Sequence, residues 1–170
     1  MKELYMVALG GKTRQSTIEV HDLQFVVGEN IEETFEILVN QWYGIKKKLH
    51  MDSYKHIQGA DGYSVEITSE LPNTSENSMK LYLVNIGGYV ESSMLEIHRI
   101  GLFVAKSEGE ARTKGKKALF KGDLQEHIDN VVEVNSCLAN GEQFFLKLTE
   151  DHKIYTNKPD WFGYKRLDII

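Results

Sequence analysis

Four ionisable residues that could do chemistry each occur twice in this chain of 170 residues, at a constant spacing of 77 positions. The pairs are Glu19 and Glu96, His21 and His98, His50 and His127, and Asp52 and Asp129. Two histidines with one or two carboxylates suit a divalent transition metal, and they also suit acid/base catalysis of a hydrolysis. The candidate metal ligands are therefore His21, His50 and Asp52, with the counterparts His98, His127 and Asp129.

Local backbone geometry should bring these residues together in pairs. Side chains two positions apart on a strand point to the same face of a sheet, so Glu19 and His21 should project side by side. His50 and Asp52 should do the same if their segment is extended. The pairing predicts two small polar clusters, one in each copy.

The first copy has one more acid than the second, because Asp22 beside His21 is replaced by Arg99. Glu19 and Asp22 are the candidates for a catalytic base. A structural interpretation stays open, since a histidine beside a carboxylate often anchors a loop to a sheet, and a duplication would copy that pair for folding alone. A site for an organic ligand or a partner is a third interpretation. The chain has no His-Glu-x-x-His motif, nucleophile elbow, phosphate loop or dinucleotide fingerprint.

The spacing of 77 positions reflects an internal duplication. The segment Leu4–Gly11 reappears as Leu81–Gly88, and the register continues without a gap for more than twenty further residues. The polar stretch between the copies contains Pro72, one of only two prolines, and is typical of a linker. The chain is accordingly divided into a first repeat, a linker, a second repeat and an aromatic C-terminal segment, at residues 1–69, 70–78, 79–150 and 151–170.

Each repeat should begin with two antiparallel strands. Leu4–Leu9 is a nearly continuous apolar run, which predicts a buried strand, and the following pair Gly10-Gly11 predicts a turn. The alternation of apolar and polar residues from Ile18 to His21 then predicts a second strand.

A helix should follow the strands in each repeat. In the first repeat Asn30 is the expected N-cap, with Glu33 three residues later, and an apolar stripe runs at helical spacing to Trp42, which we expect in the core. In the second repeat Ser107 and Glu110 occupy the same two capping positions. Gly44 and Gly122 are suited to end the two helices.

Asp61-Gly62 and Asn140-Gly141 predict the tight turns of hairpins that close the two repeats. We therefore predict an α+β protein of two pseudo-symmetric tandem repeats. Each repeat is expected to be an antiparallel sheet of order strand-strand-helix-strand-strand, with one helix packed on it. Because a repeat of this size has a thin core, the two repeats should pack together.

Composition excludes several classes of protein. The chain has 41% hydrophobic and 26% charged residues, as globular domains do, and its 20 basic and 25 acidic residues give a net charge of −5. This acidity argues against nucleic acid as a partner, so we interpret the clusters Lys46–Lys48 and Lys114–Lys121 as solvated faces. A single cysteine, Cys137, excludes an internal disulfide and a cysteine zinc site, and we expect it to be buried. With no signal-like or bilayer-spanning apolar run, we expect a cytoplasmic protein without a membrane partner.

The C-terminal segment concentrates three aromatic residues, Trp161, Phe162 and Tyr164. Such a segment either docks on its own domain or offers a surface to a partner. We expect it to dock, either at the sheet of the first repeat or between the repeats.

Several of these motifs together resemble an uncharacterised bacterial family, the domain of unknown function 1543. The resemblance rests on the Gly-Gly strand, the segment Ile18–Asp22, the pair His50 and Asp52, Asp61-Gly62-Tyr63 and the ending Trp161–Lys165. It covers nearly the whole chain and implies a cytoplasmic bacterial protein. The family implies no activity, cofactor or catalytic residue, and Arg99 marks the second repeat as the copy that has diverged more.

Two functional hypotheses follow. The first is a binding or interaction module that uses the cleft between the repeats or the aromatic segment, with a protein partner or a second copy of the chain. The alternative is a metal-dependent hydrolase that uses His21, His50 and Asp52 as ligands and Glu19 or Asp22 as base. No organic cofactor is predicted, and whether the protein is an enzyme stays open. Convergence of these side chains on one point in an open cleft would favour the metal-dependent hydrolase, and their dispersal over independent loops would exclude it.

Overall fold

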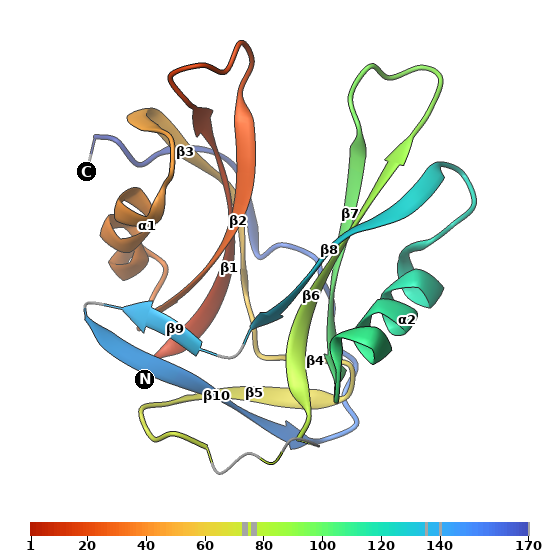
Figure 1. The fold of residues 1–170 in the computed structure, drawn as a ribbon. Helices are drawn as coiled ribbons and strands as arrows, with labels where there is room; N and C mark the ends of the chain where they lie inside the picture. The colour runs from red at the N-terminus through yellow and green to blue at the C-terminus, as the bar shows by residue number, and fades with distance from the viewer. Residues whose placement is uncertain (73–74, 76–77, 135, 140, 170) are drawn as a thin grey trace.

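The computed structural model describes residues 1–72, 75, 78–134, 136–139 and 141–169. In these ranges the chain forms three antiparallel sheets and two α-helices (Figure 1). The first sheet has the strand order β11-β3-β1-β2, with bounds Trp161–Arg166, Ile45–His56, Glu3–Lys12 and Val20–Gly28. The second has the order β7-β6-β8, with bounds Ile97–Ala105, Lys80–Tyr89 and Gln125–Val134. The third has the order β4-β5-β10-β9, with bounds Gly59–Ala60, Tyr63–Thr68, Glu142–Glu150 and Ser136–Ala139.

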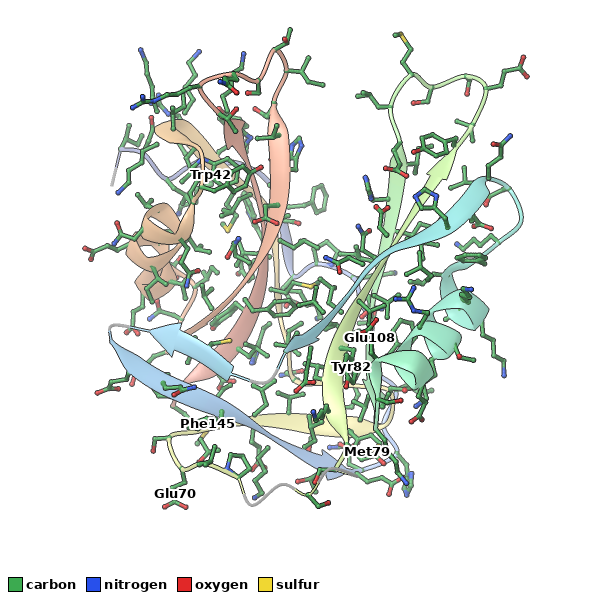
Figure 2. All side chains as sticks on the ribbon, viewed as in Figure 1. Trp42, Glu70, Met79, Tyr82, Glu108 and Phe145 are labelled. Atoms are coloured by element: carbon green, nitrogen blue, oxygen red, sulfur yellow. The ribbon has the colours of Figure 1, made fainter. Side chains whose placement is uncertain are left out.

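The second helix begins after its predicted cap, Ser107, whereas the first α-helix begins after Thr34, four residues beyond the cap predicted at Asn30. A 3-10 turn at Glu32–Thr34 leads into α1 (Phe35–Gln41), and the Glu33 amide donates to the Asn30 side chain. In α2 (Glu108–Leu119) the Glu110 amide donates to the Ser107 side chain. The expected stripe of the first helix is buried, and Trp42 at its end packs between α1 and the first sheet (Figure 2).

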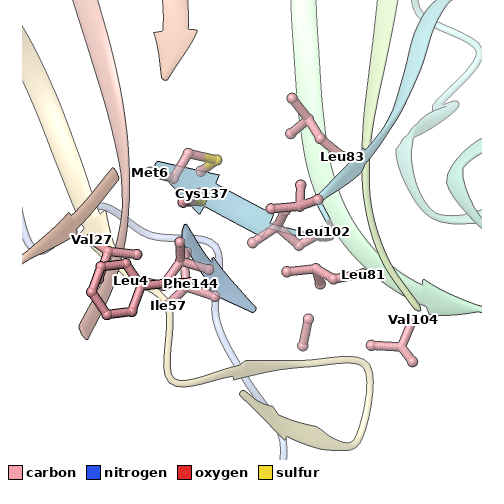
Figure 3. Close-up of a cluster of buried hydrophobic side chains, with 12 residues drawn as sticks. Leu4, Met6, Val27, Ile57, Leu81, Leu83, Leu102, Val104, Cys137 and Phe144 are labelled. Carbon is pink, nitrogen blue, oxygen red and sulfur yellow. The ribbon is translucent and has the colours of Figure 1, made fainter. Parts of the chain in front are cut away.

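The two repeats pack together through a shared apolar core. On β1 the residues Leu4 and Met6 point to this core, and on β6 Leu81 and Leu83 do so (Figure 3). The side chains that alternate with them, such as Val7 on β1, pack on the opposite face, toward the helices. Each sheet therefore presents one face to its own helix and the other to the other repeat.

The closing strands depart from the predicted topology, in which each repeat kept its own sheet. β5 of the first repeat pairs with β10 of the second, with Ile67 opposite Leu146, so the third sheet belongs to both repeats. Val65 and Leu148, which face each other in the same register, also pack against the shared core. Pairing across the repeats therefore buries apolar surface that neither thin repeat could cover alone.

The predicted turns have two different outcomes. Asp61-Gly62 forms the turn between β4 and β5, with φ values of 54° and 84°. Gly141 also has a positive φ of 82°, whereas Asn140 lies outside the described residues. The turn predicted at Gly10-Gly11 is wrong, because β1 continues to Lys12 and both glycines lie inside the strand.

The C-terminal segment adds β11 to the edge of the first sheet, next to β3. Beyond this strand, Leu167 is buried and its amide donates to the Leu49 carbonyl. Only residues 70–72, 75 and 78 of the predicted linker are described. No helix in the described ranges is long and apolar enough to cross a membrane.

Candidate functional site

The candidate residues meet around the glycines inside β1 and β6. In the first sheet Gly10 lies between His21 on β2 and His50 on β3, as the direct cross-strand neighbour of both. Gly87 lies in the same way between His98 on β7 and His127 on β8. Neighbouring strands are about 4.8 Å apart, so the two histidine backbones of each site are about 10 Å apart, with no side chain between them. Their rings can therefore lean toward each other across the glycine.

Four residues converge in the first repeat, and we call them the first-repeat cluster: Glu19, His21, His50 and Asp52. Glu19 Oε1 lies 3.2 Å from His21 Nε2 and 3.4 Å from His50 Nε2. The Asp52 carboxylate lies 3.3 Å from each of the same two ring nitrogens. Two carboxylates thus face two ring nitrogens at nearly equal distances.

The second-repeat cluster consists of the counterparts Glu96, His98, His127 and Asp129. His127 Nε2 lies 3.0 Å from both Glu96 Oε1 and Asp129 Oδ1. His98 contacts the same carboxylates, with Nδ1 3.1 Å from Asp129 and Nε2 3.6 Å from Glu96. Ligand atoms of Glu96, His98 and Asp129 all lie within 4.8 Å of one another, an arrangement that could hold a metal ion.

Glycine is required at the centre of each cluster because the cluster occupies the space of a side chain. A Cβ atom on Gly10 would lie 2.5 Å from His50 Nε2 and 3.0 Å from the Asp52 carboxylate. A Cβ atom on Gly87 would overlap the Glu96 carboxylate and lie 3.0 Å from the His127 ring. The repeated glycines therefore permit close approach inside a strand, where the sequence suggested a turn.

The clusters lie on the faces that the two sheets turn toward each other. On β1, Gly10 is an even number of residues from Leu4 and Met6, which belong to the shared core. On β6, Gly87 has the same relation to Leu81 and Leu83. Both clusters are thus further along the β1-β2 and β6-β7 hairpins than the core, toward the loops at the top of Figure 1.

His50 is held in one orientation. Its side chain is only 1% exposed, whereas that of His21 is 59% exposed. The ring Nδ1 lies 2.8 Å from the Lys48 carbonyl oxygen, and because a carbonyl can only accept, Nδ1 carries the hydrogen. Nε2 therefore faces the two carboxylates with a lone pair or with a second proton. A metal-binding histidine typically donates from its other ring nitrogen to a carbonyl in this way.

The carboxylates are partly withdrawn from water. Burial raises the pKa of the Asp52 carboxyl, an effect that His50 and His21 oppose. In the second-repeat cluster a hydrogen bond to Glu96 raises the pKa of Tyr89. Among the described residues Glu96 Oε1 is a buried oxygen without a hydrogen bond of acceptable geometry, although His127 Nε2 is nearby. The second-repeat cluster thus contains an acceptor oxygen that a cation would satisfy.

An aromatic ring lies against one histidine of each cluster. Tyr164 of β11 stacks on His50 with the ring centres 4.1 Å apart. Tyr89 of β6 lies on His127 with the centres 5.7 Å apart. The sequence identified the aromatic C-terminal segment but not this contact, because Tyr164 has no counterpart in the second repeat.

Asp22 stands apart from the cluster. Its carboxylate accepts from the Leu23 amide and from the Gln24 side chain. Arg99, its counterpart, forms ion pairs of 2.6 Å with Asp123 and 2.7 Å with Glu126. The structure therefore brings together Glu19 and the predicted metal ligands, but not the second candidate base.

Sequence reasoning missed Asn85, whose side-chain nitrogen lies 3.3 Å from both His98 Nδ1 and Asp129 Oδ2. Its counterpart in the first repeat is Ala8, so the repeat comparison gave no signal for it. Cys137 is buried in the shared core, as expected, and burial raises the pKa of its thiol to about 11. It is far from being a thiolate ligand at neutral pH.

A separate cavity lies at the other end of β6. It has a volume of about 350 Å³ and is lined mainly by apolar residues of the linker and the second repeat, among them Met79 and Phe145 (Figure 2). Lys80 and Glu133 in its wall form an ion pair of 3.0 Å. None of the described residues that line it belongs to the first repeat, so this cavity is not the cleft between the repeats that the binding hypothesis names.

Comparison with known proteins gives a family but no activity. A family model described as a Domain of Unknown Function (DUF1543) matches residues 16–67 and 93–140, more than half of the chain. The chain belongs to the DUF1543 family. The two matched regions start 77 positions apart, the spacing of the internal repeat, so the DUF1543 unit occurs twice here.

A solved structure resembles this DUF1543 chain over almost its whole length. It is the crystal structure of a protein Il1583 from Idiomarina loihiensis, with 30% sequence identity and a TM-score of 0.75. The match covers 98% of each chain. The comparison with curated proteins gives no match.

Proposed function

We propose that this protein binds divalent transition metal ions, one in the first-repeat cluster and one in the second-repeat cluster. The observation that carries the proposal is the spacing of the ligand atoms. A tetrahedral ion with bonds of about 2.1 Å holds its ligand atoms about 3.4 Å apart. The four nitrogen–oxygen contacts of the first-repeat cluster are 3.2, 3.3, 3.3 and 3.4 Å. Among the described residues, the group whose ligand atoms all lie within 4.8 Å of one another is Glu96, His98 and Asp129 of the second-repeat cluster.

Hydrogen bonding alone explains this spacing less well. Charge-assisted hydrogen bonds between nitrogen and a carboxylate are about 2.7–2.9 Å long. Elsewhere in this chain His56 Nε2 lies 2.6 Å from Glu3, as such a bond requires. The contacts of the first-repeat cluster are all longer, and Glu19 Oε1 is shared between two rings. A cation between these atoms would satisfy both carboxylates and both ring lone pairs.

Imidazole and carboxylate ligands suit zinc, manganese and iron, which are the ions to test. Glu19 and His21 are both exposed, so an ion here would have a side open to solvent. Such an ion could activate water, as the hydrolase hypothesis requires. In that hypothesis His21, His50 and Asp52 hold the ion and water takes the fourth position. Glu19 is then the remaining base candidate, because Asp22 points elsewhere.

The binding-module hypothesis expects His21, His50, Asp22 and Asp52 to be buried, hydrogen-bonded to one another and dispensable for binding. His50 is buried, as that hypothesis expects, whereas His21 is more than half exposed, which supports the metal. The cavity lined by Met79 and Phe145, at the other end of the molecule, stays a candidate site for a ligand or a partner.

Metal content tests the proposal. The protein is stripped with a chelator, dialysed against zinc, manganese or iron(II), and analysed for bound metal per chain. We expect two ions in the wild type and one in each of the variants His21→Ala and His98→Ala. The matched control is His152→Ala, since His152 is exposed and lies outside both clusters. A wild type that binds none of the three ions, or variants that keep both ions, would contradict the proposal.

A further inference from the structure

His50 differs from the other three cluster histidines because a series of contacts holds its ring on the Nδ1 side, away from the carboxylates. The ring donates from Nδ1 to the Lys48 carbonyl, so the position of the Lys48 backbone determines where Nε2 points. Among the described residues, Lys48 is one of three non-glycine residues with a positive φ, at 65°. A lysine adopts this left-handed conformation only when its surroundings hold it there.

Asp168 is the group that holds it. The Lys48 amide donates to Asp168 Oδ2 over 2.6 Å, although the two residues are 120 positions apart. Arg166 fixes the carboxylate with two hydrogen bonds, both of 2.9 Å. Between these two residues, Leu167 is buried and its amide donates to the Leu49 carbonyl. The C-terminal segment is thus anchored to Lys48 and Leu49, the two residues that precede His50.

Within the part of the chain that the structure describes, the second-repeat cluster has no such support. The counterpart of Lys48 is Gln125, and the C-terminal segment has no counterpart because it occurs once in the chain. His127, the counterpart of His50, is 44% exposed. Its ring is in looser aromatic contact than that of His50.

We infer that Asp168 is a positioning residue for the first-repeat cluster: it holds the Lys48 carbonyl on His50 Nδ1, keeps Nε2 free to bind a metal, and makes this cluster the tighter of the two. The inference rests on the proposed metal binding. It also predicts a property of the protein without metal, the tautomer of His50. This second property allows the two proposals to fail separately.

The first test is metal affinity, measured by calorimetry with one cluster at a time. In a His98→Ala background, where only the first-repeat cluster binds, Asp168→Ala should weaken metal binding by about 10–100-fold, as the loss of an outer contact to a ligand does. In a His21→Ala background the same substitution should leave the affinity of the second-repeat cluster unchanged. Equal weakening of both clusters, or no weakening of the first, would overturn the inference.

The second test is a rescue. Glycine adopts a positive φ without strain, so Lys48→Gly added to Asp168→Ala should recover part of the lost affinity. If Lys48→Gly recovers none of the lost affinity, Asp168 does not act through the Lys48 backbone.

The third test is nitrogen NMR of the histidine rings in the metal-free protein at pH 8. His50 should carry its hydrogen on Nδ1 in the wild type and shift toward the Nε2-H form in Asp168→Ala. If wild-type His50 carries its hydrogen on Nε2, the inference is wrong even if metal binds. If the tautomer shifts but no metal binds to the wild type, the proposed function fails and the positioning role remains.

Discussion

The first-repeat cluster and the second-repeat cluster have the same four ligand types at the same strand positions, yet their histidines are in different environments. His50 is buried, donates to a backbone carbonyl and is covered by Tyr164. His127 is nearly half exposed and lies in looser contact with Tyr89. The difference shows that a duplication can copy a ligand set together with its central glycine, while the rigidity of the set depends on segments that were not copied.

The polar support of the two clusters differs as well. Asn85 contacts His98 and Asp129 in the second repeat, whereas the first repeat has Ala8 at that position.

Gly10→Ala should have the largest effect. The new Cβ would meet His50 Nε2, and this ring cannot move aside because it is buried and bonded to Lys48. We expect metal binding at the first-repeat cluster to be lost and the free energy of unfolding to fall by about 1–3 kcal/mol. Calorimetry and urea denaturation measure the two effects. The control is Gly109→Ala in α2, where a Cβ meets nothing closer than 4.0 Å. Unchanged metal affinity in Gly10→Ala would show that the ion does not bind over this glycine.

Gly87→Ala should have a smaller effect of the same kind. Its Cβ would meet the carboxylate end of Glu96, a flexible side chain that is 24% exposed and can shift. We expect about tenfold weaker metal binding at the second-repeat cluster. The stability loss should stay below about 1 kcal/mol, under the usual cost of overpacking. A loss as large as that of Gly10→Ala would mean that the two clusters are equally rigid.

Removal of the aromatic rings should have a moderate effect. Tyr164→Ala takes away the ring that covers His50, and aromatic contacts of this kind contribute about 0.5–1.5 kcal/mol. Metal binding at the first-repeat cluster should weaken by up to about tenfold, since 1.4 kcal/mol corresponds to a factor of ten. Tyr89→Ala should weaken the second-repeat cluster less, because its ring is further from His127. The reverse order, measured by calorimetry, would contradict the account of why the clusters differ.

Asp22→Ala should have the smallest effect. The Asp22 carboxylate contacts the Leu23 amide and Gln24 rather than either histidine. Metal affinity should therefore be unchanged, and stability should fall by no more than about 1 kcal/mol for the lost hydrogen bonds. A clear loss of metal binding would contradict this and would mean that Asp22 supports the metal ligands indirectly.

The clusters could be predicted from the sequence because their information is local and repeated. The spacing of 77 residues paired the ligands, and the alternation of a strand placed Glu19 beside His21. The same alternation puts Asp22 on the opposite face of the strand from His21, so it should have counted against Asp22 as a base. The helix stripe ending at Trp42 was equally readable from its spacing.

Features that depend on distant residues could not be predicted. The pairing of β5 with β10 depends on which apolar faces remain uncovered after both repeats fold. The contact between Lys48 and Asp168 spans 120 positions, and no pattern in either segment indicates the other. Gly10 was misinterpreted because a glycine that ends a strand and a glycine that admits a neighbouring side chain look alike in sequence.

Anomalous X-ray diffraction from crystals grown with zinc tests the central claim most directly. Data collected above and below the zinc absorption edge locate the ion without any assumption about its ligands. We predict one peak about 2.0–2.2 Å from the Nε2 atoms of His21 and His50, and a second, weaker peak among Glu96, His98 and Asp129. Zinc peaks elsewhere with both clusters empty, or no peak at all, would contradict the assignment of these residues as metal ligands.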